Sequence, residues 1–577
     1  MDICHNDSMV RQKLHLALFF ATFVAISLIE GIHVILDLRF LYFVIFILPL
    51  LLFILDPKKK YSLPKPFIYI SGFYFIASFI SLINSRQVGT SLELFLRDIS
   101  LFLLMIYVNT NKEDIKKYIP KLLIFLSLLF IGASLFCLST SYGREFIRSI
   151  RLNLLFNPAY PHKTIGDYIT FAIIICVYFI LIKKEAWWKY PLFILTPFFI
   201  LSFSRTAYIT LGLSFLVMAF LHRERFKRIS PVLFFSLIGN LLFISILFVI
   251  FVTRTNSPIL TFIQNKLESI LFINSRPFIY SHLPFWIAGI KGFLLYPFTG
   301  IGQGNFQSIS YRFTELMFLW SNTSFAFIVD FLAEQGIGVA LSFSALILYI
   351  LVTAQKKSIF YLLFVALLIS FMGFSAYTYT QIWMLFFISA GLVLKSDNKD
   401  NFIFEKNILF IPACLGILYI QVLSFHYVLV ENGMRVQAQA VYPYNQENVE
   451  MLIESNLPYK WRQQTVVTYL AQYQHNFSID PYKLEYIGDS YQKLGKPYKK
   501  AALIAYEDSF TWGSYAYGGS LLKRMHKLYV LKNELQGEQA AKQYVRTFTQ
   551  EYRKILKMDN VKVQGDMYDN LVWDYLR

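Results

Sequence analysis

Residues 165–184 read IGDYITFAIIICVYFILIKK, a long apolar run that ends in the paired lysines Lys183 and Lys184. A predominantly apolar stretch of about 17–25 residues has the length that crosses the hydrocarbon core of a bilayer as an α-helix. Lysines that follow such a stretch mark a cytoplasmic loop, because short cytoplasmic loops carry an excess of Lys and Arg. The stretch therefore predicts a transmembrane helix that ends at the cytoplasmic face.

Apolar runs of this kind recur through most of the chain. Of its 577 residues, 56% are hydrophobic and only 16% are charged, whereas a soluble protein of this length needs more polar surface. The runs predict about 13 spans, near 14–36, 39–55, 66–84, 94–110, 121–140, 165–183, 190–204, 206–222, 232–253, 324–354, 359–377, 379–395 and 407–430. Residues 190–222 read either as two short helices or as a re-entrant hairpin. The predicted fold class is all-α, a polytopic membrane helical bundle followed by a soluble α-helical domain.

The loops between these runs alternate in charge. With Arg11 and Lys13 inside, every second loop is basic, as the positive-inside rule requires. The later basic residues are Lys58, Lys59, Lys60, Lys112, Lys116, Lys117, Lys183, Lys184, Arg223, Arg225, Lys227, Arg228, Lys356, Lys357, Lys395 and Lys399. One missed span would break the alternation downstream. The pattern therefore predicts a multi-pass protein of the bacterial inner membrane, with a cytoplasmic N-terminus and a periplasmic C-terminus.

Two predicted outer loops, about 141–164 and 253–323, carry many basic residues, although the positive-inside rule requires basic residues only in cytoplasmic loops. They carry Arg144, Arg148, Arg151, Lys163, Arg254, Lys266, Arg276, Lys291 and Arg312. An anionic substrate handled at the outer face would explain this excess; attraction to lipid phosphates of the outer leaflet is the alternative. The formal net charge is +18, but no nucleic-acid motif stands apart from the apolar runs, so nucleic acid is not an expected partner.

From about Glu431 onward, Tyr, Gln, Lys and Glu become common and the apolar runs end. This change predicts two domains, a transmembrane domain over 1–430 and an extracytoplasmic helical domain over 431–577. Residues 486–506 predict a helix, a tight turn at Gly495 and a second helix, which resembles a tetratricopeptide repeat. A second helix pair is expected over 519–535 and 538–556. A generic helical hairpin domain is the alternative, and either form binds or positions a partner.

Ionisable side chains at the outer ends of predicted spans are candidates for chemistry, because such residues are costly inside a membrane. The candidates are Arg205, Glu93, Arg97, Asp98, Asp330 and Glu334. Glu93 and Arg97 are one helical turn apart and can pair. For Asp330 and Glu334, also one turn apart, structural pairing or snorkelling toward water is the alternative to a substrate contact.

The larger outer loop has a pattern of its own. It contains Arg276, then His282 and Trp286, and then the run Gly300-Ile301-Gly302-Gln303-Gly304-Asn305-Phe306. The alternating glycines predict a compact turn with backbone N–H groups open to a ligand. The spacing is not GxGxxG, so it does not indicate a nucleotide site. His282 is the only histidine of this loop and is a candidate general base.

Together these residues resemble the O-antigen ligase and O-antigen polymerase family of bacterial envelope glycosyltransferases. The matching features lie within residues 190–355: Ser204-Arg205, Trp286, Pro297, Gly300–Phe306 and the segment Phe331-Leu332-Ala333-Glu334-Gln335-Gly336-Ile337-Gly338. The resemblance implies a GT-C-like bundle. It also implies that a glycan passes from an undecaprenyl-diphosphate carrier to an acceptor hydroxyl, on lipid A-core or on another glycan or protein, without metal or other cofactor.

The resemblance also implies roles for particular residues. Arg205 and Arg276 would grip the diphosphate, since the guanidinium fork binds phosphate bidentately. His282, the candidate base from the loop pattern, stands where the family tends to place an arginine. The expected substrate-binding residues are Arg97, Gly302, Gly304, Asn322 and Glu334. The chain departs from the family pattern ahead of Ala333-Glu334, where Trp320-Ser321-Asn322-Thr323 stands in place of a histidine. His162 is therefore a second candidate base.

Several functions share these features. Beside a ligase, the chain reads as a polysaccharide polymerase or a protein O-oligosaccharyltransferase using the same donor. A transporter of lipid-linked glycans is an alternative of another class, but it predicts internal repeats and broken helices near the midplane, and no clear repeat is visible. A non-catalytic envelope scaffold whose helical tail binds partners is the third reading. Membrane lipids are expected partners in every case.

Overall fold

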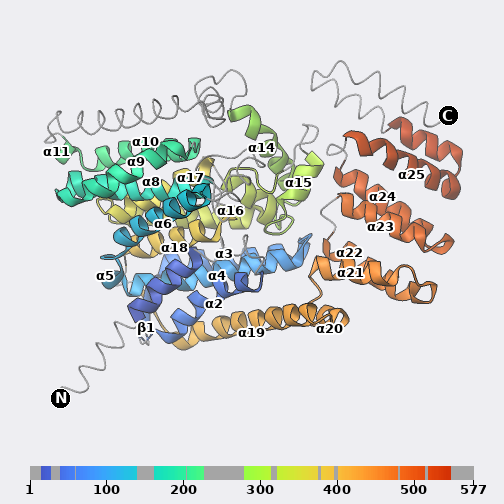
Figure 1. Ribbon diagram of the computed structural model, residues 1–577, viewed down its shortest axis with the longest axis horizontal. Coiled ribbons are helices and arrows are strands. Elements are labelled where there is room, and N and C mark those ends of the chain that lie inside the picture. Colours follow the sequence, from blue (N-terminus) through green and yellow to red (C-terminus); the bar gives the residue numbers. More distant parts are fainter. Residues whose placement is uncertain are drawn as a thin grey trace. The chain divides into compact units, whose positions relative to one another are not determined.

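The computed structural model describes residues 15–27, 39–56, 58, 60–139, 162–202, 204–226, 278–313, 321–373, 378–395, 401–477, 481–513 and 518–547. These residues are mostly helical (Figure 1), as the sequence predicts. The predicted span 232–253 lies outside the described residues, as do most of the outer loop 141–164 and the stretch that contains Arg276.

Among the described residues, four helices are long and apolar enough to cross a membrane: Lys65–Asn84, Ile165–Lys183, Phe327–Thr353 and Lys406–Glu431. They contain α3 (Lys65–Ser81), α8 (His162–Tyr178), α16 (Phe327–Thr353) and α19 (Lys406–Glu431). Each coincides with a predicted span, so the expectation of apolar membrane-length helices is confirmed for them. The total of about 13 spans stays a prediction.

Shorter helices occupy several other predicted spans. They are a helix over 15–27, α2 (Arg39–Leu55), α4 (Val88–Thr110), α6 (Ile119–Ser139), α9 (Lys189–Leu201), α10 (Arg205–Leu221), α17 (Ile359–Gly373) and α18 (Thr380–Val393). One more helix, α14 (Phe278–Leu295), lies in the predicted outer loop 253–323, where no helix was expected. Residues 190–222 thus hold two helices, with α9 only about 20 Å long at 1.5 Å per residue. The short helices α5 (Lys112–Ile115) and α11 (Arg223–Phe226) lie in predicted cytoplasmic loops.

The chain divides into two compact units. Unit 1 comprises the described residues within 1–72, 96–278 and 342–421, and unit 2 those within 73–95, 279–341 and 422–577. The predicted domain boundary between residues 430 and 431 does not coincide with this division, because residues 73–95 and 279–341 belong to the same unit as the C-terminal residues. The assignment of 431–577 to a separate domain stays a prediction.

Helix α8 lies at the centre of unit 1. Helices α6, α9, α10 and α17 contact it, and its apolar length from Ile165 onward is almost entirely buried. Its buried polar groups are bonded to neighbours: the Ser370 hydroxyl donates to Asp167 (3.0 Å) and the Ser127 hydroxyl to the Tyr168 carbonyl (3.0 Å). Burial of an apolar helix with its polar groups paired fits a bundle in which each backbone group is satisfied internally.

Two other apolar helices expose much of their surface. On α3, Tyr69, Phe73, Ile76 and Phe79 are each more than half exposed, and on α19 the exposed residues are Ile408, Ile411, Leu415 and Leu418. Monomeric soluble proteins rarely expose apolar patches of this kind. Faces like these are suited to contact with lipid chains.

Unit 1 also contains a small sheet that the all-α expectation missed. Strands β1 (Lys60–Pro64) and β2 (Asn401–Glu405) pair antiparallel, with Lys60 opposite Glu405 and Pro64 opposite Asn401. The correction is small, because only five residues on each side are involved. Both strands lie at loops that the charge alternation predicts to be cytoplasmic, and that topology stays a prediction.

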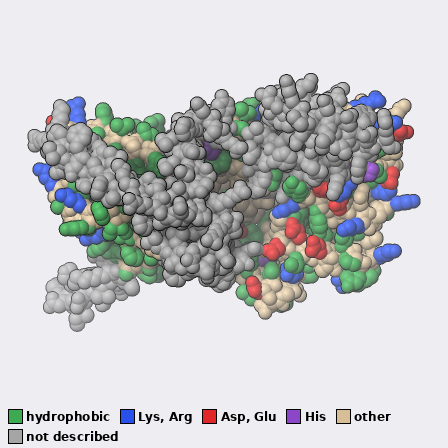
Figure 2. Space-filling view, turned by 45° about the horizontal axis from the view of Figure 1, so that its top comes forward, with side chains coloured by type: hydrophobic (Ala, Val, Ile, Leu, Met, Phe, Trp, Pro, Cys, Tyr) green, Lys and Arg blue, Asp and Glu red, His purple; other side chains and the backbone are tan. Residues whose placement is uncertain are grey.

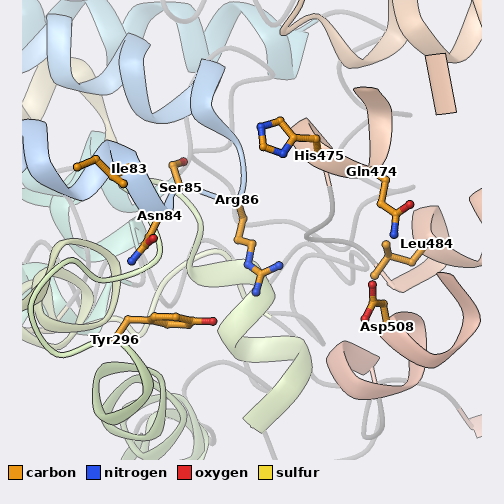
Figure 3. Close-up of a pocket in the computed structure, with 9 residues that line it drawn as sticks. All are labelled: Ile83, Asn84, Ser85, Arg86, Tyr296, Gln474, His475, Leu484 and Asp508. Carbon is orange, nitrogen blue, oxygen red and sulfur yellow. The ribbon is translucent and has the colours of Figure 1, made fainter. Parts of the chain in front are cut away.

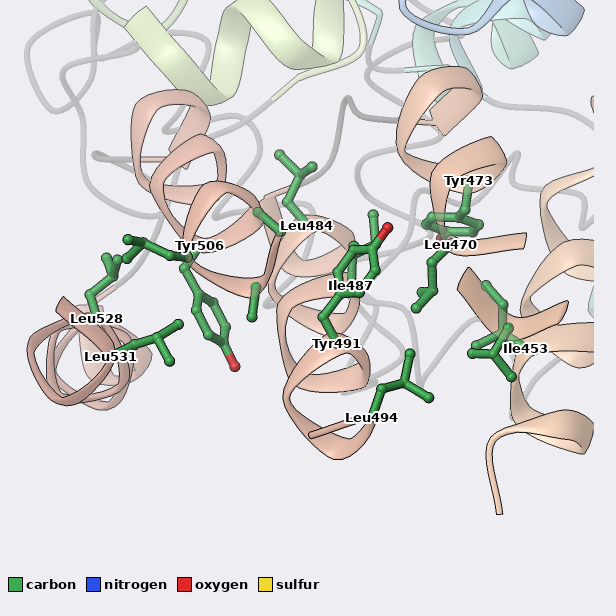
Figure 4. Close-up of a cluster of buried hydrophobic side chains, with 14 of the residues drawn as sticks. Ile453, Leu470, Tyr473, Leu484, Ile487, Tyr491, Leu494, Tyr506, Leu528 and Leu531 are labelled. Atoms are coloured by element: carbon green, nitrogen blue, oxygen red, sulfur yellow. The ribbon is translucent and has the colours of Figure 1, made fainter. Parts of the chain in front are cut away.

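The C-terminal part of unit 2 is a succession of helices, here called the helical tail. It consists of α20 (Arg435–Val441), α21 (Gln446–Asn456), α22 (Gln463–Phe477), α23 (Pro481–Lys493), α24 (Lys499–Gly513), α25 (Gly518–Gln536) and a helix over 538–547. Consecutive helices from α21 to α25 contact one another. One core of buried side chains, including Ile453, Leu470, Ile487, Tyr506 and Leu528, runs through them (Figure 4).

The predicted helix–turn–helix is present in this tail. The turn between α23 and α24 contains Gly495 at φ 100°, a conformation that favours glycine. A Cβ atom at Gly488 would lie 2.6 Å from the ring of Tyr506, so the small residue lets the two helices approach. The next expected pair is helical over its described residues. Membership in the tetratricopeptide class stays a prediction.

Candidate functional site

The glycine turn Gly300–Phe306 is the core of the candidate site in unit 2. Gly300, Gly302 and Gly304 have φ values of 62°, 94° and 80°, and a Cβ atom at Gly300 would lie 2.2 Å from the backbone of Glu334. These positions therefore require glycine, and the predicted compact turn is confirmed in its backbone conformation.

The N–H groups of this turn are partly used inside the protein. The Gly302 N–H donates to the Glu334 carbonyl (2.7 Å), and the Gly300 N–H to the Tyr296 carbonyl (2.8 Å). The expectation that the turn leaves these donors open is wrong for both residues, because the neighbouring segments approach closely enough to take them. Contact of Gly302 or Gly304 with a substrate stays a prediction.

Glu334 holds the glycine turn to the helix that follows it. Its buried carboxylate accepts from the N–H of Phe306 (2.8 Å), the first residue of α15 (Phe306–Phe313). A carboxylate at a helix N-terminus is favourable, because the unpaired N–H groups there carry partial positive charge. Asp330, one turn earlier, similarly accepts from the Ser324 N–H (2.5 Å). These internal hydrogen bonds fit a structural role for Asp330 and Glu334, which is the alternative to a substrate contact. A substrate contact of Glu334 stays a prediction.

Helix α16 is broken where the glycine turn meets it. Gly336 has φ 79° and ψ −178° inside the helix. The Ile337 N–H donates to the Pro297 carbonyl (2.8 Å), and a Cβ atom at Gly336 would lie 2.4 Å from the Phe298 carbonyl oxygen. Two of the segments that carry the family resemblance, Pro297–Phe306 and Phe331–Gly338, therefore bind each other.

A second segment of unit 2, residues 84–91, is bonded to the other side of the glycine turn. The Arg86 N–H donates to the Ile301 carbonyl (3.1 Å), and the Ser91 hydroxyl donates to the Gln303 carbonyl (2.6 Å). The Asn305 amide also donates to the Ser85 hydroxyl (3.0 Å). These bonds place the backbone of Arg86 at the turn. Sequence reasoning did not name Arg86, although its position in a predicted outer loop is the same signal that marked the other basic residues.

A polar cavity of about 360 Å³ adjoins this segment in unit 2. Figure 3 shows the Arg86 side chain extending between Tyr296 and the helical tail. The tail contributes Gln474, His475 and Asp508 to the lining. A guanidinium, an imidazole, a carboxyl, an amide and a phenol thus face one space, a set that suits a polar ligand with anionic groups.

The charges around this cavity influence one another. Burial lowers the pKa of the Arg312 guanidinium; nearby Tyr296 opposes this, and the positive charge of Arg86 lowers it further. Burial raises the pKa of the Asp508 carboxyl, and Arg86 opposes that shift. Arg86 therefore interacts electrostatically with both Arg312 and Asp508, and an anion bound at Arg86 would offset its repulsion of Arg312.

Two of the three predicted catalytic residues lie among the described residues, Arg205 in unit 1 and His282 in unit 2. His282 is half-buried in α14, with its ring centroid 4.3 Å from that of Phe325. Arg205 begins α10, directly after Ser204, whose hydroxyl accepts from the Ala207 N–H (3.3 Å) and caps the helix. Arg276 and the side chain of His162 lie outside the described residues. Asn322, a predicted substrate contact, is exposed in a bend.

Arg97 is a fully buried cation in unit 1. Its Nε and Nη2 atoms donate to Asp98 Oδ1 (3.3 and 3.2 Å), which also accepts from the Trp383 indole (2.9 Å). Its Nη1 atom has no hydrogen-bond partner among the described residues. The expected partner Glu93 instead lies 3.4 Å from the Tyr442 hydroxyl. An interior guanidinium nitrogen without a partner is unfavourable, so Arg97 retains a donor suited to an anionic ligand.

No family model, curated protein or solved structure matches this chain. Within the described part of the chain, no three His, Cys, Asp or Glu side chains gather as metal ligands. The expectation of chemistry without a metal or other cofactor stays a prediction.

Proposed function

We propose that the chain is a membrane glycosyltransferase that moves a glycan from an undecaprenyl-diphosphate carrier to an acceptor hydroxyl at the outer face of the bacterial inner membrane. The observation that carries the proposal is Arg86, which is bonded to the glycine turn through its backbone N–H and lines the polar cavity with Tyr296, and whose charge interacts with that of Arg312. Arginine pairs suit a diphosphate, because each guanidinium can donate two parallel hydrogen bonds and remains charged.

The proposed reaction requires positive charge to stabilise the leaving diphosphate and one base to accept the hydroxyl proton. The acceptor oxygen attacks the anomeric carbon of the glycan as the bond from that carbon to the diphosphate oxygen breaks. The diphosphate leaves with the electron pair, and a base takes the hydroxyl proton. Arginines stabilise the charge that develops on the leaving diphosphate. In this proposal Arg86 and Arg312 do so, Arg205 and Arg276 keep the role that the resemblance gives them, and His282 is the base.

The composition of the cavity supports a site for two substrates. Arg86 and Tyr296 come from segments next to the glycine turn, whereas Gln474, His475 and Asp508 come from the helical tail. In the proposal the first group contacts the diphosphate donor and the tail orients the acceptor. Positioning two reactants in this way accounts for a large part of the rate in such transfers. Lipid A-core, a growing polysaccharide and a protein hydroxyl remain alternative acceptors.

A complementation experiment tests the proposal. The full chain is expressed in a strain that lacks its own ligase and polymerase, and the envelope glycan is separated by gel. Arg86→Ala and Arg312→Ala should each reduce long-chain glycan at least about tenfold, the loss expected from one charge-assisted contact. Arg546→Ala, an exposed arginine of the tail, is the matched control. Unchanged glycan in both site variants, at equal protein abundance, contradicts the proposal.

The break of α16 favours a second candidate, a transporter of lipid-linked glycans. Interrupted helices are typical of secondary transporters, and Gly336 interrupts an apolar helix. Proteoliposomes discriminate between the two functions. A transferase converts donor and acceptor to product with the lipid on one side, whereas a transporter moves the labelled lipid across the bilayer with no acceptor present.

A further inference from the structure

Unit 1 contains a cavity of about 740 Å³ that is rich in lysine. Five lysines line it: Lys116, Lys117, Lys183, Lys356 and Lys357. No Asp or Glu is among the described residues of its lining. These lysines come from three stretches of chain, and every one belongs to a loop that the charge alternation assigns to the cytoplasmic side. The cavity is therefore separate from the candidate site in unit 2.

A specific contact joins two of the three loops. The Tyr178 hydroxyl, at the end of α8, donates to the Lys357 carbonyl (3.1 Å), which ties the Lys183 stretch to the loop before α17. Of the five ammonium groups, that of Lys116 is paired with exposed Glu113. Figure 2 shows Lys and Arg side chains grouped at the end of unit 1 where Figure 1 labels α5 and α11. Cations gathered in one space repel one another, and a bound anion would offset this.

The remaining lining adds to the preference for an anion. Two helices begin at the cavity, since Pro120 of α6 and Ile359 and Phe360 of α17 belong to its lining. The N-terminus of a helix carries partial positive charge and attracts phosphate groups. The Phe360 N–H is capped by the Ser358 hydroxyl (3.2 Å), so the ligand would be held chiefly by the lysines, with the helix dipoles in support.

The cavity also has apolar residues in its lining. Its walls include Pro120, Phe179, Ile359 and Phe360. Helix α8 ends near the cavity, and together with the π-helical residues 179–183 that follow it this helix is long enough to cross a membrane. A soluble anion gains nothing from such walls, whereas a lipid buries the upper part of its chains there. Basic pockets of this kind at the cytoplasmic ends of apolar helices suit the headgroups of anionic lipids.

We propose that this cavity binds the phosphate headgroup of an anionic phospholipid, with a two-phosphate lipid such as cardiolipin as the best fit to five lysines. The lysines neutralise the phosphates, and the apolar walls hold the first carbons of the acyl chains. This inference does not depend on glycan transfer, since it uses other residues in another unit.

The test measures lipid binding to the full chain, purified in a neutral detergent. Native mass spectrometry compares cardiolipin with phosphatidylcholine, and inorganic pyrophosphate is the soluble competitor. The site variant is Lys117→Gln, Lys183→Gln and Lys357→Gln. Its matched control is Lys121→Gln, Lys184→Gln and Lys189→Gln, which removes the same charge from exposed lysines outside the lining.

The wild type and the control should bind cardiolipin at least about tenfold more tightly than the site variant, as the loss of three phosphate contacts implies, and phosphatidylcholine should bind weakly to all three. Equal cardiolipin binding by the two variants would overturn the proposal. So would pyrophosphate binding to the cavity without any preference for cardiolipin, which would indicate a soluble anion site. If the triple variant does not fold, Lys183→Gln alone should give a smaller loss in the same direction, and no loss would overturn the proposal.

Discussion

Glu334 allows a structural role to be separated from a role in substrate binding. Its carboxylate accepts the N–H of Phe306 at 2.8 Å, and both residues are buried. Glu334→Ala leaves that N–H without an acceptor, which costs about 1–3 kcal/mol. The loss of a carboxylate at the N-terminus of α15 adds about 0.3–1 kcal/mol. The expected decrease in the free energy of unfolding is therefore about 1–4 kcal/mol.

Glu334→Gln sharpens the experiment, because the amide oxygen can still accept from Phe306. Only the charge is lost, so the decrease should stay below about 1 kcal/mol. The assay is thermal unfolding of the purified full chain in detergent, followed by intrinsic tryptophan fluorescence, with exposed Glu431→Ala as the control. Equal melting temperatures for wild type and Glu334→Ala would refute the reasoning. If Glu334 also contacts substrate, Glu334→Gln should melt normally and yet lose glycan transfer.

Three further predictions use the same unfolding assay. Gly488→Ala places a Cβ atom 2.6 Å from the Tyr506 ring and should destabilise the tail by about 1–3 kcal/mol. Gly433→Ala is the comparison: Gly433 has open space around it but a φ of 73°, so this substitution should act only through backbone strain. Trp383→Phe removes the indole N–H that Asp98 accepts and should cost about 1–3 kcal/mol, unlike Trp187→Phe at a half-exposed position. The pKa of the Asp508 carboxyl is raised in the folded chain, so the folded state binds more protons than the unfolded state. The free energy of unfolding should therefore fall as the pH rises from the ordinary pKa of 3.8 toward the raised one. Asp508→Asn should remove this pH dependence, and an unchanged dependence would contradict the assignment.

Features that depend on local pattern were predictable from the sequence. Apolar length alone gave the bounds of helices such as 165–183, since crossing a bilayer needs a fixed number of residues. The turn at Gly495 followed from the glycine itself, which adopts turn conformations readily. These properties belong to single segments or to neighbours along the chain, so they need no knowledge of the tertiary structure.

Features that depend on distant segments were not predictable in the same way. The strands Lys60–Pro64 and Asn401–Glu405 are too short to read as strands alone, and each is stabilised by a partner more than 300 residues away. The internal use of the Gly302 N–H depends on Glu334 reaching it. Arg86 stands beside the glycine turn because Ile301 accepts its N–H and the neighbouring serines, Ser85 and Ser91, are bonded to the turn as well. Such contacts are decided by packing, which one sequence does not reveal.

The central proposal is glycan transfer supported by arginines, and an in vitro reaction tests it most directly. The purified full chain is given an undecaprenyl-diphosphate-linked glycan and an acceptor, and both the product and the released undecaprenyl diphosphate are measured. For the wild type and for Arg546→Ala, we predict that the glycan product and the released undecaprenyl diphosphate form in equal amounts. For Arg86→Ala, kcat/KM should fall at least about tenfold, a loss of about 1.4 kcal/mol in transition-state stabilisation. No product from any acceptor, or an unchanged rate in Arg86→Ala, would contradict the account.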